Sequence, residues 1–467
     1  MVALMLALVV PNAALADAND ASARMTRQMQ IKMQINRQRY GIAGQAVWAA
    51  HNGRTIVQGV DGYADVDGKE RLTADHVLPV YSLSKLFVSV LIMQLVEGGQ
   101  VDLDQPASVY APGLPASWRS ISVRQFLNHQ SGVPEYYDET QAKLVFPASL
   151  HAALYGLANK PLLFPAGTRT RYTGTNSLVL SMILERHYGK PYGEIADERI
   201  IKKLGLKYTG LGTGWLPETG VARAYIGKDG QLRKDDHIDW PVYSFAHGSL
   251  YSSLNDLSRF LQAVAAGELV GKATLQRLWQ PPTLADGQRA GFASGWEYGE
   301  SGAYREVGHD GGARVRVRIA FDDSLDGDTY TFIYLTNGSA RNVWSRILLD
   351  SAMATLAPRR FPANVLSEQL IAFASKPANG RQQAALIRSI RANGAIKGQD
   401  LERTVNNSGY AIRENLGVDA AIGVFAINTE LFPRSANSWD SLAEAYAARG
   451  DKDKAKALYA KARELSK

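Results

Sequence analysis

Hydrophobic and polar residues alternate in three stretches of the chain, and this period predicts β-strands near both ends of its larger part. Residues 44–65 (GQAVWAAHNGRTIVQGVDGYAD) alternate on either side of Asn52-Gly53, a dipeptide typical of tight hairpin turns. Residues 315–321 (VRVRIAF) and 329–335 (TYTFIYL) flank a turn-rich segment that contains a glycine. We expect these strands to enclose the long middle of the chain.

The middle of the chain has the pattern of helices joined by loops. Residues 82–95 (SLSKLFVSVLIMQL) are almost wholly apolar and are followed by Gly98-Gly99, as expected of a buried helix with a glycine stop. Further helices are expected at about 20–38, 123–129, 178–187 and 254–266. The whole predicts an α/β (α+β) domain whose antiparallel sheet is flanked by helices and encloses a helical insertion.

The pattern changes after residues 357–362 (APRRFP), where a linker precedes a part that is helical alone. Two segments there match at a period of about 34 residues, the spacing of tetratricopeptide repeats. The second is the better match, with Trp439 and Tyr446 among its packing positions, and the first ends at Pro433. A plain helical hairpin is the alternative. We predict a linker and helix over 361–398 and tetratricopeptide-like repeats over 399–467, through which a protein partner could bind.

The first residues form a short apolar run that ends in Ala14-Leu15-Ala16, the small-residue pattern cleaved by signal peptidase. No Lys or Arg precedes the run, so a longer signal or a buried N-terminal helix are the alternatives. We predict a signal peptide over 1–16, export to a bacterial periplasm, and a catalytic domain over 25–360. No other stretch approaches the ~20 apolar residues of a membrane span.

The composition narrows the classes of function. The 467 residues are 46% hydrophobic and 21% charged, as in an ordinary globular protein. Cysteine is absent, which excludes disulfides, thiolate metal sites and a cysteine nucleophile. The net charge is +7, and the Lys and Arg residues are scattered among acidic residues instead of forming a basic stripe, so no nucleic-acid partner is predicted. No metal-binding spacing such as His-Glu-x-x-His occurs, and no cofactor is predicted.

Candidate chemistry begins at Ser82-Leu83-Ser84-Lys85, at the start of the apolar helix. One helical turn places the side chains of Ser82 and Lys85 on the same face. A serine hydroxyl is a weak nucleophile until a neighbouring base takes its proton, and an amine held in a partly dry pocket can have a lowered pKa. By itself the tetrapeptide could also be an exposed helix start.

Three further motifs follow this tetrapeptide in order. They are residues 127–134 (LNHQSGVP), residues 164–176 (FPAGTRTRYTGTN) and residues 308–312 (GHDGG). Together the four motifs, over about 42–337, resemble the superfamily of penicillin-binding proteins and class C β-lactamase-like serine hydrolases, which includes D,D-peptidases and esterases. The resemblance implies a β-lactamase-like fold and acyl transfer through a covalent acyl-enzyme.

The resemblance also implies roles for individual residues. Ser82 would be acylated, Lys85 would assist its deprotonation, and Tyr172 would be the shared acid and base, provided that cations such as Lys85 lower its pKa. Substrate binding would involve His309, Gly311, Gly312 and Asn176, with the N–H groups of Ser82 and Gly312 forming the oxyanion hole.

The sequence departs from the family pattern at two positions. Gly174 stands where the family usually has asparagine, and His309 stands where it often has lysine. These departures favour a peptidase or esterase acting on D-amino-acid peptides, esters or amides, including peptidoglycan-derived ones, over a β-lactamase. A catalytically weak peptidoglycan- or peptide-binding protein with a partner-recruiting repeat module is the alternative. For His129 and His247, a packing role is favoured over a catalytic one.

Overall fold

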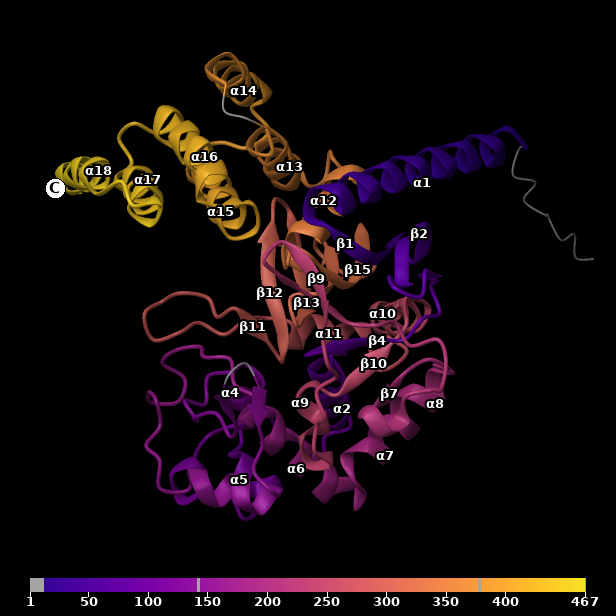
Figure 1. Ribbon diagram of the computed structural model, residues 1–467. Helices are drawn as coiled ribbons and strands as arrows, with labels where there is room; N and C mark the ends of the chain where they lie inside the picture. The colour runs from indigo at the N-terminus through magenta and orange to yellow at the C-terminus, as the bar shows by residue number, and fades with distance from the viewer. Residues whose placement is uncertain (1–11, 141–142, 377–378, 467) are drawn as a thin grey trace, which may run out of the picture.

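The larger part of the protein is built on an eight-stranded antiparallel sheet in the order β11-β12-β13-β14-β15-β1-β2-β3. The computed structural model describes residues 12–140, 143–376 and 379–466 (Figure 1). The strands are β1 (Ile42–His51), β2 (Arg54–Asp65), β3 (Glu70–Arg71), β11 (Phe292–Ala293), β12 (Trp296–Ser301), β13 (Tyr304–Gly311), β14 (Val315–Phe321) and β15 (Thr329–Ser339). Strands from the two ends of this part meet where β1 pairs with β15.

The hairpin predicted from the sequence is confirmed. His51 pairs with Arg54, and the two turn residues Asn52 and Gly53 both have positive φ, 49° and 74°. Two consecutive residues with positive φ give the turn whose twist matches that of the flanking strands. The late strands are confirmed as well, because β14 spans the predicted residues and β15 runs beyond the predicted end to Ser339.

Helices cover both faces of this sheet. Along β1, the side chains of Ala46 and Trp48 belong to one hydrophobic core, and those of Val47 and Ala49 belong to the other. Because successive side chains of a strand point to opposite faces, a strand covered on both faces is apolar throughout. In Figure 1, α1 (Asn12–Tyr40) and α12 (Ser345–Leu356) lie above the sheet and the helical insertion lies below it.

The insertion holds most of the remaining helices and a small second sheet. Its helices are α2 (Ser84–Glu97), α3 (Ala107–Tyr110), α4 (Val123–Leu127), α5 (Leu150–Leu157), α6 (Thr175–Tyr188), α7 (Tyr192–Ala196), α8 (Lys202–Leu204), α9 (Phe245–Gly248), α10 (Leu254–Ala266) and α11 (Lys272–Leu278). The second sheet has the order β4 (Leu78–Tyr81), β10 (Leu250–Ser252), β7 (Gly210–Leu211), and two small hairpins pair β5 (Asp138–Thr140) with β6 (Lys143–Val145) and β8 (Tyr225–Lys228) with β9 (Gln231–Lys234).

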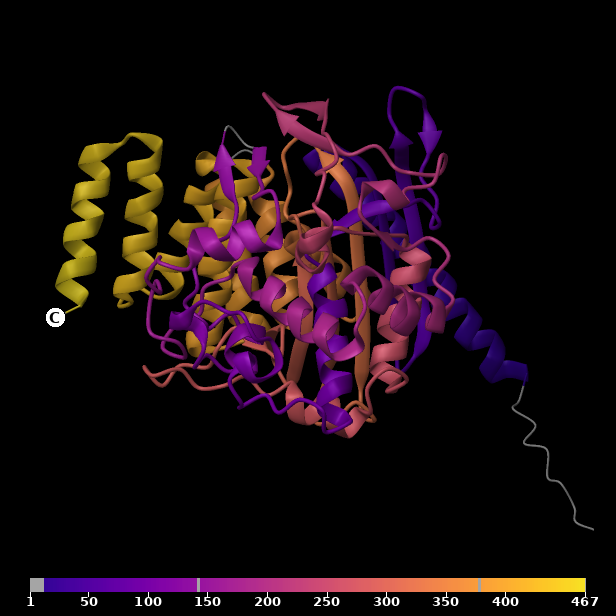
Figure 2. The same cartoon turned by 90° about the horizontal axis from the view of Figure 1, so that it is seen from below.

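The chain continues after α12 as helices alone. They are α13 (Pro362–Ala374), α14 (Gly380–Asn393), α15 (Gly398–Leu416), α16 (Val418–Leu431), α17 (Ala436–Arg449) and α18 (Lys452–Leu465). The predicted linker and helix over 361–398 therefore contains two helices, α13 and α14. Figure 2 shows α17 and α18 (yellow) at the edge of the molecule. That these helices are tetratricopeptide repeats stays a prediction.

The C-terminal helices are joined to the sheet domain by a shared core. Phe361 is fully buried among Tyr304, Tyr330 and Phe332, and the same core extends from α1 through α12 to α16 and α17. Polar contacts add to it: Glu368 of α13 pairs with Lys32 of α1 at 2.8 Å. The helices are therefore anchored to the face of the sheet that α1 and α12 cover.

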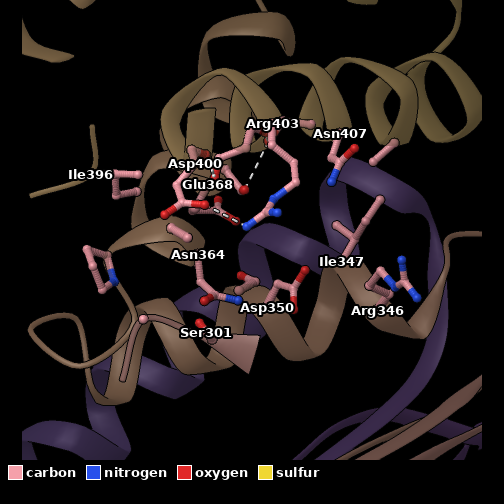
Figure 3. Close-up of a pocket in the computed structure, with 18 of the residues that line it drawn as sticks. Ser301, Arg346, Ile347, Asp350, Asn364, Glu368, Ile396, Asp400, Arg403 and Asn407 are labelled. Carbon is pink, nitrogen blue, oxygen red and sulfur yellow. Dashed lines mark hydrogen bonds and ion pairs between the residues drawn. The ribbon is translucent and has the colours of Figure 1, made fainter. Parts of the chain in front are cut away.

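A cavity of about 940 Å³ lies between α12, α13 and α15. Asp350, Asn364 and Arg403 are among the residues that line it (Figure 3). Ser82, Lys85 and Tyr172 do not line it, so this cavity is separate from the predicted catalytic residues.

The predicted signal peptide overlaps the start of the described chain. Residues 1–11 lie outside the described residues, and α1 begins at Asn12. Among the helices that the structure describes, none combines the length and the apolar character that crossing a bilayer requires.

Candidate active site

Ser82 lies at a sharp turn between β4 and α2. The turn is made by Tyr81, whose φ of 48° is unusual for a residue with a side chain. Such a conformation costs of order 1–3 kcal/mol and persists only where its surroundings hold it. Here the Tyr81 hydroxyl accepts a hydrogen bond from Arg314 at 2.8 Å. The result places Ser82 just before α2, one turn away from Lys85.

The second serine of the motif, Ser84, has a structural role. Its hydroxyl donates to the carbonyl oxygen of Tyr81 at 2.7 Å and accepts the N–H of Leu250 at 2.9 Å. Ser84 is fully buried, whereas Ser82 is partly exposed. Ser84 thus ties the start of α2 to β10, and Ser82 is left accessible.

Two polar side chains converge on the Ser82 hydroxyl. The Tyr172 hydroxyl donates to Oγ at 2.8 Å, and Nζ of Lys85 lies 3.3 Å from the same atom. Nζ is also 4.8 Å from the centre of the Tyr172 ring. Lys85 comes from α2 and Tyr172 from the loop before α6, so the fold brings together the three residues predicted from the sequence to be catalytic.

Lys85 is buried, with 5% of the residue exposed. Burial lowers its pKa from 10.5 to about 7, and the carboxylate of Glu135 opposes this shift only in part. Nζ donates to the carbonyl oxygen of His247 at 2.6 Å. A neutral amine keeps a lone pair while it donates, so Lys85 can accept the Ser82 proton near neutral pH.

Tyr172 behaves differently from the sequence-based expectation. Burial of its hydroxyl raises its pKa well above 10, and the hydrogen bond to Ser82 lowers it only in part. The condition set in the sequence analysis, a pKa lowered by cations such as Lys85, is not met, because the cost of burying the charged phenolate outweighs the hydrogen bond from Tyr172 to Ser82. Although the residue is 42% exposed, its hydroxyl points at Oγ and keeps its proton.

His129 and Asn176 form a buried pair behind Tyr172. Nδ1 of His129 lies 2.8 Å from Nδ2 of Asn176, and Oδ1 of Asn176 accepts from Ser131 at 2.6 Å. The His129 ring packs 4.5 Å from the Tyr172 ring. Both amide atoms of Asn176 are thus engaged inside the protein, and its predicted role in substrate binding stays a prediction. His129 supports Tyr172 from behind.

His309 lies on β13, close before the start of β14, and is 1% exposed. Its Nδ1–H donates to the carbonyl oxygen of Asp310 at 2.7 Å. Burial lowers its pKa, while Glu297 opposes the shift. The neutral ring therefore carries its lone pair on Nε2, which is buried without a hydrogen-bond partner among the described residues. Its predicted contact with substrate would be as an acceptor.

The two glycines after His309 let β13 approach the serine turn closely. A side chain at Gly311 would overlap the carbonyl oxygen of Val80. One at Gly312, whose φ is 52°, would lie 2.7 Å from the Tyr81 ring. Gly312 therefore lies beside the residue that precedes Ser82, a placement consistent with the predicted oxyanion hole.

Two site residues make contacts that the sequence analysis did not predict: Glu135 was not singled out there, and His247 was expected only to pack. The carboxylate of Glu135 accepts hydrogen bonds from the N–H groups of Gly174 at 2.8 Å and Thr175 at 3.2 Å. These N–H groups lie at the start of α6, where they have no partner within the helix. His247 supplies the carbonyl that holds Lys85. Neither has a local signal, since both are distant in sequence from the residues they contact. Within the described ranges, no group of three or more His, Asp or Glu side chains could hold a metal ion.

Comparison with known proteins agrees with this geometry. The family model described as Beta-lactamase matches residues 21–349. The chain belongs to the beta-lactamase family. The fold class and the family predicted from the sequence are confirmed, and Ser82, Lys85, Tyr172 and His309 all lie inside the matched region.

Curated relatives of this family member include D-aminopeptidases. Those of Brucella ovis and Brucella anthropi are each 26% identical, over 292 and 288 residues, which is 59% of this chain and 53% of theirs. The chain thus spans about half the length of these relatives. Among solved structures, the hydrolase EstCE1 matches with a TM-score of 0.61 at 20% identity, covering 72% of this chain and 100% of that one. The D-amino acid amidase of Ochrobactrum anthropi matches with a TM-score of 0.58 at 22% identity, covering 74% and 100%.

Proposed function

We propose that the protein is a serine hydrolase that forms an acyl-enzyme on Ser82 and acts on D-amino-acid peptides, amides or esters. One observation carries the proposal: the Ser82 hydroxyl lies between the Tyr172 hydroxyl, which keeps its proton, and the amine of Lys85, whose pKa is about 7. A nucleophile with a neutral base on one side and a proton donor on the other is the arrangement that acyl transfer requires.

The steps follow from these protonation states. Oγ of Ser82 attacks the substrate carbonyl carbon as its proton passes to Nζ of Lys85. The carbonyl π electrons move to oxygen, which the N–H groups of Ser82 and Gly312 stabilise. When the oxyanion collapses, the bond to the leaving nitrogen or oxygen breaks. The leaving atom takes the Tyr172 proton, and the ammonium of Lys85 returns a proton to Tyr172. Water then hydrolyses the acyl-enzyme by the reverse transfers.

The substrate class is supported by the relatives. Curated proteins that resemble this chain are named D-aminopeptidases, and a protein with the same fold is a D-amino acid amidase solved with D-phenylalanine.

The test compares the two enantiomers of an amino acid amide and of its p-nitrophenyl ester, using the full-length protein and Ser82→Ala. We expect turnover of the D-enantiomers, no turnover by Ser82→Ala, and an unchanged circular dichroism spectrum. Ser84→Ala is a matched control, because it also removes a serine hydroxyl from this turn. If Ser84→Ala keeps activity and Ser82→Ala does not, the loss in Ser82→Ala comes from the missing nucleophile and not from misfolding. Equal turnover by wild type and Ser82→Ala would overturn the mechanism, and turnover of the L-enantiomers alone would overturn the substrate class. A protein that binds such peptides without turning them over would be the binding protein considered above.

We further propose that the protein is exported and that the helices after residue 398 bind a protein partner. Support for export is the apolar run before Ala14-Leu15-Ala16. The partner proposal rests on the period of the C-terminal helices. Fractionation of cells that express the full chain tests export, and protein recovered only from the cytoplasm, with its N-terminus intact, would contradict it.

A further inference from the structure

The ring of His247 fills the space that a side chain at position 174 would need, beside the catalytic residues. A Cβ atom built on Gly174 would lie 2.7 Å from Nε2 of His247 and closer still to Nδ1 and Cε1 of the same ring. The backbone of Gly174 is not the reason for a glycine here, since its φ of −69° is an ordinary helical value. Gly174 therefore has no side chain because the imidazole fills that space.

The imidazole is held by its other neighbours. Its Nδ1 lies 3.0 Å from the Tyr136 hydroxyl. The ring packs edge-on against Trp240, with ring centres 4.9 Å apart, and at a tilt of 31° against Tyr137, with ring centres 5.4 Å apart. His247 is 5% exposed, and burial holds its pKa well below 6.5, so the ring is neutral. These contacts fix the position of the His247 peptide group.

That peptide group holds the catalytic amine. Nζ of Lys85 donates to the His247 carbonyl oxygen at 2.6 Å. Among the described residues, the contacts recorded for Nζ are this carbonyl, the Ser82 hydroxyl and the Tyr172 ring. Of these, only the carbonyl can direct an N–H of Lys85 so that the lone pair of the amine is left for Ser82.

We propose that His247 is a positioning residue that holds Lys85 against Ser82, and that Gly174 is kept small to admit its imidazole. The inference rests on the proposed function and deepens it: at the position where the family usually has asparagine, Gly174 leaves space for the ring of a histidine from α9. A side chain at position 174 is expected to displace the His247 ring, because its Cβ would overlap that ring.

A double-mutant cycle with Gly174→Ala and His247→Ala tests the proposal on the full-length protein. For each variant, kcat/KM for an activated ester is measured against pH, together with thermal unfolding. Gly156→Ala is the matched control for Gly174→Ala, because Gly156 lies in α5 with no atom within 4 Å of its added Cβ. Gly156→Ala should keep wild-type kcat/KM.

The expected results are specific. Gly174→Ala should lose at least about tenfold in kcat/KM. His247→Ala should move the acid limb of the pH profile upward by about one pH unit, because water entering the vacated space restores part of the pKa of Lys85, and one unit corresponds to a tenfold loss of free amine. In the His247→Ala background, Gly174→Ala should cost nothing further, since the overlap is gone.

The outcomes that overturn the proposal are equally distinct. Wild-type activity in Gly174→Ala, losses that add in the double variant, or an unchanged acid limb in a folded His247→Ala protein would each contradict it. Should His247→Ala fail to fold, His247→Asn keeps a polar partner for the Tyr136 hydroxyl, and an acid limb closer to wild type is then expected. The proposed function fails separately, when Ser82→Ala retains ester turnover.

Discussion

Nζ of Lys85 lies closer to the carbonyl oxygen of His247, at 2.6 Å, than to Oγ of Ser82, at 3.3 Å. The amine is thus anchored by a backbone group that does not take part in proton transfer. Its position then depends on how firmly α9 is held.

Lys85→Met should abolish turnover and stabilise the protein. The folded pKa of about 7 lies below the unfolded value of 10.5, so the unfolded chain binds the extra proton between these pH values. The free energy of unfolding of wild type should therefore rise with pH from about 7 to 10.5, by at most about 1.4 kcal/mol per pH unit. Below about pH 7, Lys85 is charged in both the folded and the unfolded chain, so the free energy of unfolding is lowered by the full cost of burying that charge.

Urea unfolding of wild type and Lys85→Met across this pH range measures the difference. The variant should be more stable at pH 7, and its advantage should shrink toward pH 10.5. A difference that does not change with pH would show that the Lys85 pKa is not shifted.

Tyr172→Phe should impair amide hydrolysis more than hydrolysis of p-nitrophenyl esters. Its raised pKa makes Tyr172 a donor to the leaving group, and an amine leaving group needs that proton more than a nitrophenolate does. A loss of about 10² to 10⁴ is typical for a general acid. Tyr155→Phe, at a residue that is 76% exposed, is the control. Equal losses for both substrates would argue against Tyr172 as the acid.

Gly312→Ala should reduce acylation, because its Cβ would lie 2.7 Å from the Tyr81 ring and disturb the turn that presents Ser82. Gly302→Ala is a matched control, since Gly302 has a similar φ of 62° with open space around it. Both substitutions carry the backbone strain of positive φ, about 1 kcal/mol, but only the first should slow ester turnover. Comparable rates in the two variants would contradict the close approach of β13 to the turn.

That Ser82, Lys85 and Tyr172 lie together could be predicted because their signal is local or ordered along the chain. Ser82 and Lys85 lie one helical turn apart, and Tyr172 follows a recognisable motif. For His247 only a packing role was predicted; its contact with Lys85 could not be predicted, because a backbone carbonyl makes it and the ring occupies the space left by Gly174. A sequence pattern does not show which side chain will fill the space next to a given glycine.

The strands that were missed have equally physical reasons. β12 and β13 contain charged residues, so hydrophobic and polar residues do not alternate clearly along them. One of these charges, Glu297 of β12, is paired with Arg318 of β14 inside the sheet domain. β4, β7 and β10 are short, and β4 is recognisable only by its pairing with β10. The hairpin at Asn52-Gly53 was predicted because its turn chemistry is local.

A chain that ends after Pro362 should keep a reactive Ser82 but lose stability. Every described contact of Ser82 comes from residues before Pro362. The truncation exposes the side of the hydrophobic core that α13 and α15 cover. It also removes the ion pair of Glu368 with Lys32 and the hydrogen bond that Asn415 accepts from the N–H of Trp344. Probe labelling and thermal unfolding should be measured on one sample. A well-folded truncated protein that no longer reacts would show that the C-terminal helices shape the active site.

The central claim is that Ser82 is the activated nucleophile, and peptide mapping by mass spectrometry after a fluorophosphonate probe tests it most directly. Wild type and Ser84→Ala should carry one adduct on the peptide that contains Ser82, at a rate that rises with pH through about 7 as Lys85 loses its proton. Ser82→Ala should carry none. An adduct on another residue, or equal labelling of Ser82→Ala, would contradict the assignment.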